Sequence, residues 1–139
     1  MRILPANLYQ AVKVAYTAKA TDTKAKYLPV LNHCRIYRHD GLLKVEATNL
    51  EKAARKHVPA LFVKGEEVNI CVPLKPFRDW LNVVQKNYNA ALIMTFDYQA
   101  MTLTAEIEGE RSRTVFNCMH AQEWPNNAVD ELLRKEWTQ

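Results

Sequence analysis

The sequence predicts an α+β fold in which two helices pack on antiparallel sheets and a short third helix closes the chain. Residues 6–18 and 74–88 repeat apolar side chains at the spacing of an amphipathic helix. Each of these segments is followed by stretches in which apolar and polar residues alternate, as they do in half-buried strands. Asp40-Gly41 stands between two such stretches, and this pair is a strong signal for a β-hairpin.

The length and composition are those of one globular domain. The chain has 139 residues, of which 48% are hydrophobic and 24% are charged, enough to bury a core without disulfides or metal. No apolar run approaches the roughly 20 residues of a membrane helix, and residues 1–20 lack the continuous apolar region of a signal peptide. We therefore expect a soluble, cytoplasmic protein that does not contact membranes.

The first half begins with a short extended segment, residues 1–4, and the helix at 6–18, which Pro5 precedes. One face of this helix is apolar and the opposite face is polar, with Gln10, Lys13 and Thr17. Residues 21–26 are predicted to form a polar loop. In the hairpin that follows, one face is expected to meet the core and the other water, with Lys44, Glu46 and Thr48 on the wet face. Residues 51–59 form a weaker strand, because Pro59 discourages a helix.

The second half repeats this layout. A strand at 68–72 leads into the helix at 74–88, in which Pro76 is tolerated because it lies in the first turn. Three strands follow at 91–98, 101–107 and 111–119. The helix has an apolar stripe on one side and a polar face on the other. The polar face consists of Lys75, Arg78, Asp79, Asn82 and Lys86.

The pattern of the tail, residues 121–139, predicts a short helix that begins near Asn126-Asn127 and has its apolar residues on one side. Those residues are Val129, Leu132, Leu133 and Trp137. We expect this helix to pack on its own domain, ahead of two alternatives: covering a sheet edge, or docking on a partner.

Composition also narrows the chemistry. Three separated cysteines in strand-like runs are typical of small buried side chains, and the four histidines have no zinc-site spacing, so we expect no metal and no cofactor. No glycine-rich phosphate loop or nucleophile elbow occurs, which argues against an enzyme. Residues 1–38 hold seven basic residues and one acidic residue, whereas residues 105–139 hold four and seven. This asymmetry favours a polyanion at one end and a basic partner at the other.

Four short motifs resemble, in order, a single N-terminal-type domain of the bacterial DNA polymerase III beta sliding clamp. They are Leu-Pro-Val-Leu at 28–31, the hairpin at 40–51 that ends in Thr-Asn-Leu-Glu, Val72-Pro73 before the second helix, and Trp124-Pro125. The family has Leu-Pro-Ile-Leu, Thr-Asp-Leu-Glu, Val-Pro and Phe-Pro there, so Asn49 and Trp124 depart from it. The resemblance implies a clamp domain at 1–125 followed by a helical tail at 126–139, where the bacterial clamp has three domains.

The resemblance also implies a function without bond chemistry: a ring whose helices face duplex DNA and hold it without reading its sequence. A one-domain chain would need to oligomerise, and six copies would match the six domains of the bacterial dimer. We expect a replication or repair processivity factor with replication proteins as partners. The expected DNA-binding residues are Gln10, Lys13, Thr17, Lys24, Lys26, Lys75, Arg78, Asn82 and Lys86.

Three alternatives stay open at this stage. The helix faces are ordinary solvated surfaces, or the chain is a monomeric clamp-like domain that binds a clamp subunit or replication protein without surrounding DNA. A third alternative is single-strand binding, for which Tyr9, Tyr16 and Tyr37 are exposed-looking aromatics near basic residues. Acidic residues near the late strands suit a basic partner surface across a sheet edge; they are Glu106, Glu108, Glu110 and Glu123.

Overall fold

The elements follow one another in the order that the sequence predicts, with a short helix, two 3-10 turns and a two-residue strand in addition. A computed structural model describes residues 1–137, although the side chains of Glu136 and Trp137, and so the predicted place of Trp137, lie outside that description. The helices are α1 (Pro5–Tyr16), α2 (Asp22–Tyr27), α3 (Leu74–Asn87) and α4 (Asn126–Trp137), and two 3-10 turns cover Pro29–Asn32 and Ala121–Glu123. The strands are β1 (Arg2–Ile3), β2 (His33–His39), β3 (Leu42–Thr48), β4 (Ala53–Val58), β5 (Asn69–Pro73), β6 (Leu92–Asp97), β7 (Thr102–Ile107), β8 (Arg113–Asn117) and β9 (Met119–His120).

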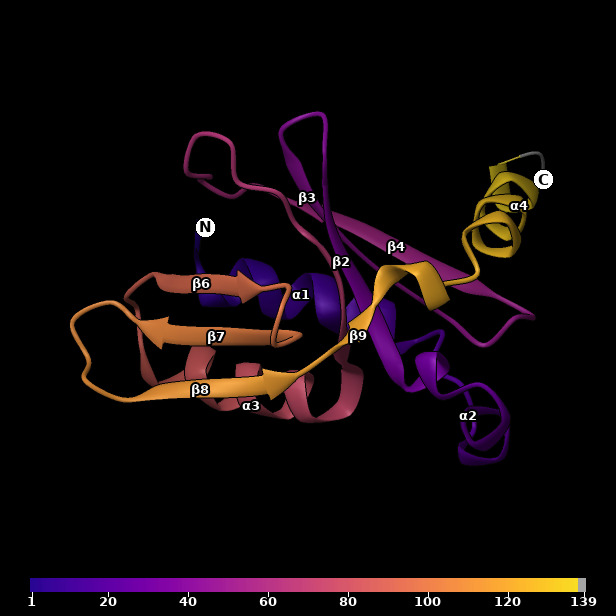
Figure 1. Ribbon diagram of the computed structural model, residues 1–139, viewed down its shortest axis with the longest axis horizontal. Helices are drawn as coiled ribbons and strands as arrows, with labels where there is room; N and C mark the ends of the chain where they lie inside the picture. Colours follow the sequence, from indigo (N-terminus) through magenta and orange to yellow (C-terminus); the bar gives the residue numbers. More distant parts are fainter. Residues whose placement is uncertain (138–139) are drawn as a thin grey trace.

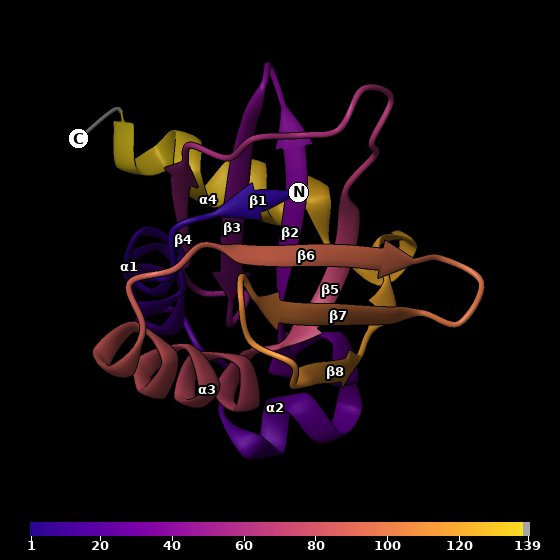
Figure 2. The same cartoon turned by 90° about the vertical axis from the view of Figure 1, so that its left-hand side faces the viewer.

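The strands form two antiparallel sheets, ordered β1-β6-β7-β8 and β4-β3-β2-β5-β9. Figure 2 shows the first sheet in front, with its strands running across those of the second. Each half of the chain gives its leading strand to the other half: β1 pairs with β6, and β5 pairs with β2. Neither half can therefore complete its own sheet alone, and the two halves fold as one unit.

Helices α1 and α3 lie side by side against the sheets and share one core with them (Figure 1). The apolar stripe of α1, which includes Leu8 and Val12, is fully buried against β3 and β4. In α3, Phe77 is fully buried and meets Phe116 of β8 edge-on, with ring centroids 5.2 Å apart. Both predicted amphipathic helices are confirmed, because burial of each stripe removes apolar surface from water.

The predicted hairpin is also confirmed. Asp40 and Gly41 have φ angles of 52° and 75°, the left-handed conformation that a two-residue hairpin turn of this kind requires. The register places Tyr37 opposite Lys44 and Arg35 opposite Glu46. The weakly predicted strand at 51–59 exists as β4, while the segment at 111–119 divides into β8 and β9, which join different sheets.

The prediction of a polar loop at residues 21–26 is wrong, because this segment forms helix α2. Thr21 is the N-cap of that helix: its hydroxyl oxygen accepts a hydrogen bond from the Lys24 backbone N–H at 3.2 Å. Asp22 stands in the first turn and Lys24 and Lys26 in the last, an order that suits the helix dipole. A threonine followed by an aspartate was the signal for this helix in the sequence.

Replacing the cap gives a first test of the local structure. Thr21→Ala removes the oxygen that satisfies an otherwise unpaired helix N–H, so we expect the free energy of unfolding to fall by about 1 kcal/mol. Urea unfolding followed by circular dichroism measures this. Thr23→Ala, an exposed change in the same helix, serves as the control; equal losses in both variants would contradict the capping role.

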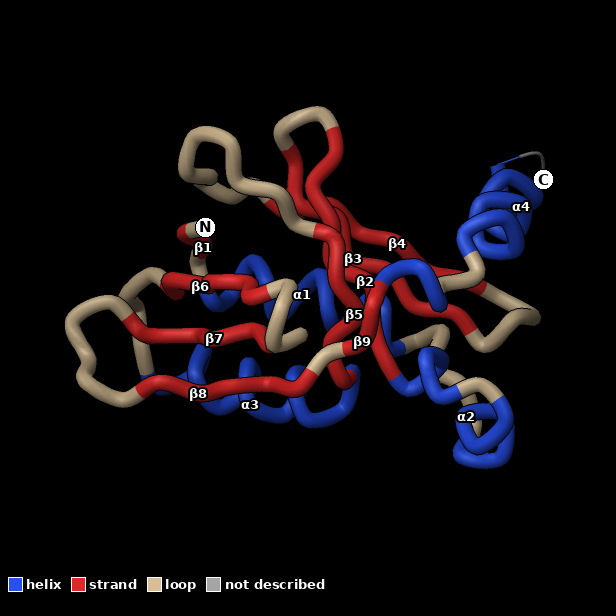
Figure 3. Tube along the Cα trace, viewed as in Figure 1, coloured by secondary structure: helices blue, strands red, loops and turns tan. Residues whose placement is uncertain are grey.

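The expectation that one face of β3 is wet is wrong at two positions, because Glu46 and Thr48 are fully buried. The tail covers this region, where α4 contacts β4 (Figure 3). Val129 of α4 is fully buried in a second apolar cluster with Trp124 and Cys71. The tail helix thus packs on its own domain, which was the first of the three expectations. The division of the chain at residue 125 stays a prediction.

The cysteines divide into two that are buried and one that is half-buried. Cys34 and Cys71 lie in the two apolar clusters, as the sequence predicts, while Cys118 is only half-buried. Burial raises the pKa of Cys71 and of Cys118 to about 12 and raises that of Cys34 further. Because the thiolate is the reactive form, raised pKa values favour the less reactive thiol form of all three at neutral pH.

Candidate nucleic-acid interface

The polar faces of α1 and α3 form one continuous surface because the two helices are neighbours. Gln10 and Lys13 of α1 are exposed, as is Thr17 at its C-terminal cap, and Lys75 and Lys86 of α3 are exposed as well. Arg78 links the helices: its guanidinium carbon lies 4.0 Å from the centre of the Tyr16 ring on α1. The structure therefore brings seven of the nine predicted DNA-binding residues onto this pair of helices, here called the helix face.

Not every cation on the helix face is equally available. Arg78 donates two hydrogen bonds to Asp79, at 2.8 and 3.2 Å, and this contact raises the pKa of Arg78. Lys75 lies 3.9 Å from the same carboxylate, a distance at which an exposed pair contributes little. Lys13 and Lys86 have no ion-pair partner within residues 1–135. Asp79 thus offsets part of the positive charge, and Lys13, Lys75 and Lys86 supply most of the field.

The neutral members of the helix face make local contacts. The Thr17 hydroxyl donates to the Val14 carbonyl oxygen at 2.6 Å and so closes the end of α1. Asn82 is half-buried and accepts a weak hydrogen bond from Gln85 at 3.4 Å. Gln10 lies near the middle of α1 and its side chain is exposed.

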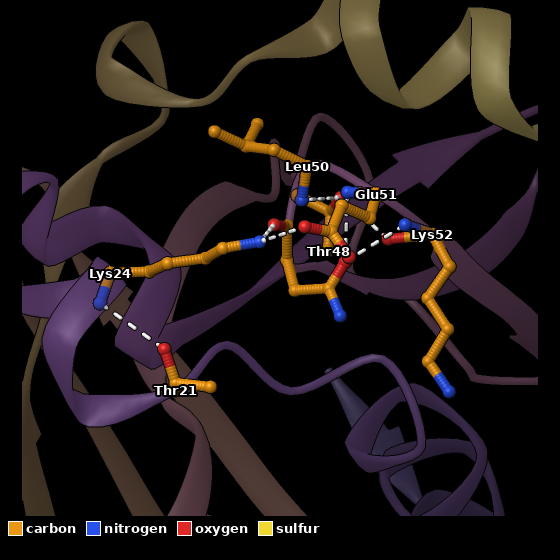
Figure 4. Close-up of polar contacts among 7 residues, drawn as sticks. Thr21, Lys24, Thr48, Leu50, Glu51 and Lys52 are labelled. Carbon is orange, nitrogen blue, oxygen red and sulfur yellow. Dashed lines mark hydrogen bonds and ion pairs between the residues drawn. The ribbon is translucent and has the colours of Figure 1, made fainter.

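The remaining two predicted residues, Lys24 and Lys26, lie apart from the helix face on α2. Lys24 donates to the Asn49 carbonyl oxygen at 3.0 Å and to Glu51 Oε1 at 2.9 Å, as Figure 4 shows. Its ammonium therefore ties α2 to the turn between β3 and β4, and it is half-buried there. Lys26 is exposed. Sequence spacing could not show that Lys24 meets Glu51, because 27 residues separate them.

The turn that ends the hairpin is built by its own side chains. Asn49 Oδ1 accepts hydrogen bonds from the Glu51 and Lys52 backbone N–H groups, both at 2.8 Å, and Thr48 Oγ1 accepts one from the Leu50 N–H at 3.0 Å. Leu50 takes a φ of 73° between them (Figure 4). The Thr-Asn-Leu-Glu motif is therefore a folding motif: short polar side chains replace the backbone bonds that a turn lacks.

The three tyrosines expected to be exposed are half-buried instead. Tyr16 is covered by Arg78 and by Lys19, whose ammonium lies 5.5 Å from the ring centre. Tyr37 is covered by Arg35, whose guanidinium carbon lies 3.9 Å from its ring centre, and burial raises the pKa of Tyr37 to about 12. Rings whose faces already carry a cation are poor platforms for stacking bases. Lys19 itself joins the helix face through Tyr16, a role that helical spacing did not reveal.

Residues 1–137 contain no helix that is both long and apolar enough to cross a bilayer. They also contain no group of three or more histidine, cysteine, aspartate or glutamate side chains arranged to hold a metal ion.

The fold is that of a DNA sliding-clamp domain: two strand-helix-sheet halves with helices α1 and α3 side by side. It is similar to the DNA polymerase III beta subunit of Pseudomonas aeruginosa, with a TM-score of 0.73 and 18% identity over 90% of this chain. The sliding clamp of Caulobacter crescentus gives 0.75 and 18% over 89%. The Helicobacter pylori beta clamp, solved bound to a DNA ligase peptide, gives 0.73 and 14% over 90%.

The chain covers only 31 or 32% of the length of these clamp chains, which is one domain of each. No protein-family profile matches the sequence, and no curated protein does so either. At 14 to 18% identity the likeness establishes the fold and leaves the activity to be argued from this chain's own residues.

Proposed function

We propose that this protein holds duplex DNA on its helix face, without sequence preference, as a clamp-type domain in DNA replication or repair. The observation that carries the proposal is the placement of three exposed lysines on two adjacent helices of a clamp fold: Lys13, Lys75 and Lys86. Lysine ammonium groups contact phosphates and release counterions, which supplies affinity independent of base sequence. Gln10 and Thr17 add neutral polar groups near Lys13, and contacts of this kind to phosphates carry no sequence information.

Salt dependence tests this proposal directly. We expect the affinity for a random-sequence duplex, measured by fluorescence anisotropy, to fall with salt, with a log-log slope of about −3, because each neutralised phosphate contributes roughly 0.9. Two duplexes of unrelated sequence should bind equally. A slope near zero, or a clear preference for single strands over duplex, would contradict the proposal.

A ring requires more domains than this chain provides, and the first candidate source is further copies of the chain. The sheets offer two long unpaired edges within the described residues, β4 and β8, as head-to-tail assembly needs. Their charges are alike, however: β4 carries Arg55 and Lys56, and β8 carries Arg113 beside Arg111. Copies joined edge to edge would place like charges at every seam.

This observation favours a second candidate function, in which a clamp-like domain works on a different protein that supplies the opposite charge. Light scattering separates the two candidates. We expect a mass near the 16.1 kDa of one chain at low salt, with any self-association growing as salt screens the repulsion. A mass near six times that of one chain at low salt would establish a ring of copies and reject the argument from edge charge.

A further inference from the structure

A groove of about 570 Å³ runs along the free edge of β4, between α1 and α4. One wall is formed by Val14 of α1 and by Thr17 and Ala18, which follow that helix, and the other by Leu133 of α4. The floor is β4 itself, which pairs only with β3 among the described residues. The groove therefore presents an unpaired row of backbone donors and acceptors between two partly apolar walls, the geometry that accepts an added strand.

The groove is basic. Its lining includes three basic side chains, Lys44, Lys52 and Arg55, together with His57, and none of its lining residues is acidic. An adjoining pocket of about 240 Å³ shares Lys44 and Arg55 and adds Arg35 and His39. Within residues 1–135, the ammonium groups of Lys44 and Lys52 have no hydrogen-bond or ion-pair partner. The positive charge of these two lysines is therefore not compensated within the described residues, whereas the arginines have carboxylate partners.

The two arginines are held in place from below. The buried Glu46 carboxylate lies 3.2 Å from Arg35 on β2 and 2.8 Å from Arg55 on β4, its neighbours in the sheet. Asp130 of α4 binds Arg55 at 2.9 Å and is the one acidic lining residue of the two cavities. Because Glu46 is fully buried, an arriving ligand meets the lysines, the arginines and His57, and not the carboxylate that orients them.

The residues of β8 itself match the basic groove poorly in charge, which disfavours the β8 edge of a second copy as the occupant. Residues 111–117, which include β8, carry two arginines and no acidic residue. The other two sheet edges, β1 and β9, are only two residues long. An occupant that complements the groove must instead be extended, acidic and supplied by another protein.

We propose that the β4 groove binds an extended acidic segment of a different protein, which joins the sheet as a strand on β4. Its backbone would pair with the free edge, its carboxylates would contact Lys44 and Lys52, and its apolar side chains would rest on Val14 and Leu133. This names the partner chemistry for the second candidate function, and it does not depend on DNA binding by the helix face.

The test uses the full chain and synthetic peptides of six residues, matching the length of β4. One peptide alternates glutamate with valine, a second replaces glutamate by lysine, and a third is the glutamate peptide with alternate backbone nitrogens methylated. We expect the glutamate peptide to bind at least about tenfold more tightly than either of the others in fluorescence anisotropy. Amide shifts in nuclear magnetic resonance should centre on residues 53–58.

A matched pair of variants locates the site. Lys44→Glu with Lys52→Glu reverses two cations in the groove, and Lys64→Glu with Arg111→Glu reverses two exposed cations outside it. We expect the first pair to weaken the glutamate peptide at least about tenfold and the second to leave it within about twofold. Far-ultraviolet circular dichroism confirms that both variants are folded.

Three outcomes would overturn the proposal: no binding of the glutamate peptide, equal binding of the glutamate and lysine peptides, or full binding of the methylated peptide. Full binding of the methylated peptide would mean that backbone pairing with β4 does not contribute and that surface charge alone attracts the peptide. None of these outcomes bears on the salt-dependent DNA titration, so failure of this proposal and failure of DNA binding are separately visible.

Discussion

Reversing Lys13, Lys75 and Lys86 to glutamate together is expected to weaken binding to duplex DNA by at least about 100-fold at low salt. Each substitution removes a phosphate contact and adds an anion that repels the duplex. The three side chains are exposed and do not belong to the apolar core, so the fold should be unaffected. Arg78 is left unchanged because it packs on Tyr16 and joins the two helices.

The control for this experiment carries the same change in net charge elsewhere. Lys64, Arg111 and Arg113 are exposed and lie outside α1 and α3. Their reversal lowers the overall charge equally, so it reports the non-local part of the effect. If both triple variants lose the same affinity, DNA responds to net charge alone and the helix face is not the binding surface. If the helix variant retains full affinity, the proposed function is wrong.

Glu46→Gln is expected to lower the free energy of unfolding by about 3 kcal/mol. The substitution keeps the shape of the side chain but removes the charge between Arg35 and Arg55, which are 16% and 25% exposed. Two poorly solvated guanidinium groups would then face each other without their shared carboxylate. Urea unfolding measures the loss.

Glu51→Gln provides the matched control for this prediction. Glu51 also forms an ion pair, with Lys24, but its side chain is 79% exposed, and exposed pairs contribute about 0 to 1 kcal/mol. A change of less than about 0.5 kcal/mol in Glu46→Gln would mean that the carboxylate is dispensable. The same variant should loosen the arginines of the β4 groove, so peptide binding there is expected to weaken as well.

The contrast between Glu46 and Glu51 illustrates where sequence patterns reach their limit. Alternation within β3 assigns Glu46 to water, yet Glu46 is buried, whereas Glu51, five residues further along, is exposed. Glu46 is buried because residues from β2, β4 and α4 converge on it, and Asp130 is 75 residues from Arg55. No window of local sequence contains that information.

The helix face shows the same division. The polar sides of α1 and α3 follow from the apolar spacing within each helix. The exposure of Lys13 and Lys75 on those sides could therefore be predicted from the sequence. That these two sides form one surface depends on the packing of α1 against α3, which the Arg78 to Tyr16 contact reports. Lys24 was assigned to the same surface because it is basic, and the structure places it on α2 against Glu51.

The sequence by itself determined the two amphipathic helices, the hairpin at Asp40-Gly41, the apolar side of each strand and, through four short motifs, the resemblance to a clamp domain. These features depend on side chains a few positions apart, whose geometry the backbone dictates. Only the tertiary structure decided the exchange of β1 and β5 between halves, the burial of Glu46, the packing of α4 and the basic groove on β4. Those features arise where distant segments compete for the same contacts, and the free energy of the whole fold settles which of them meet.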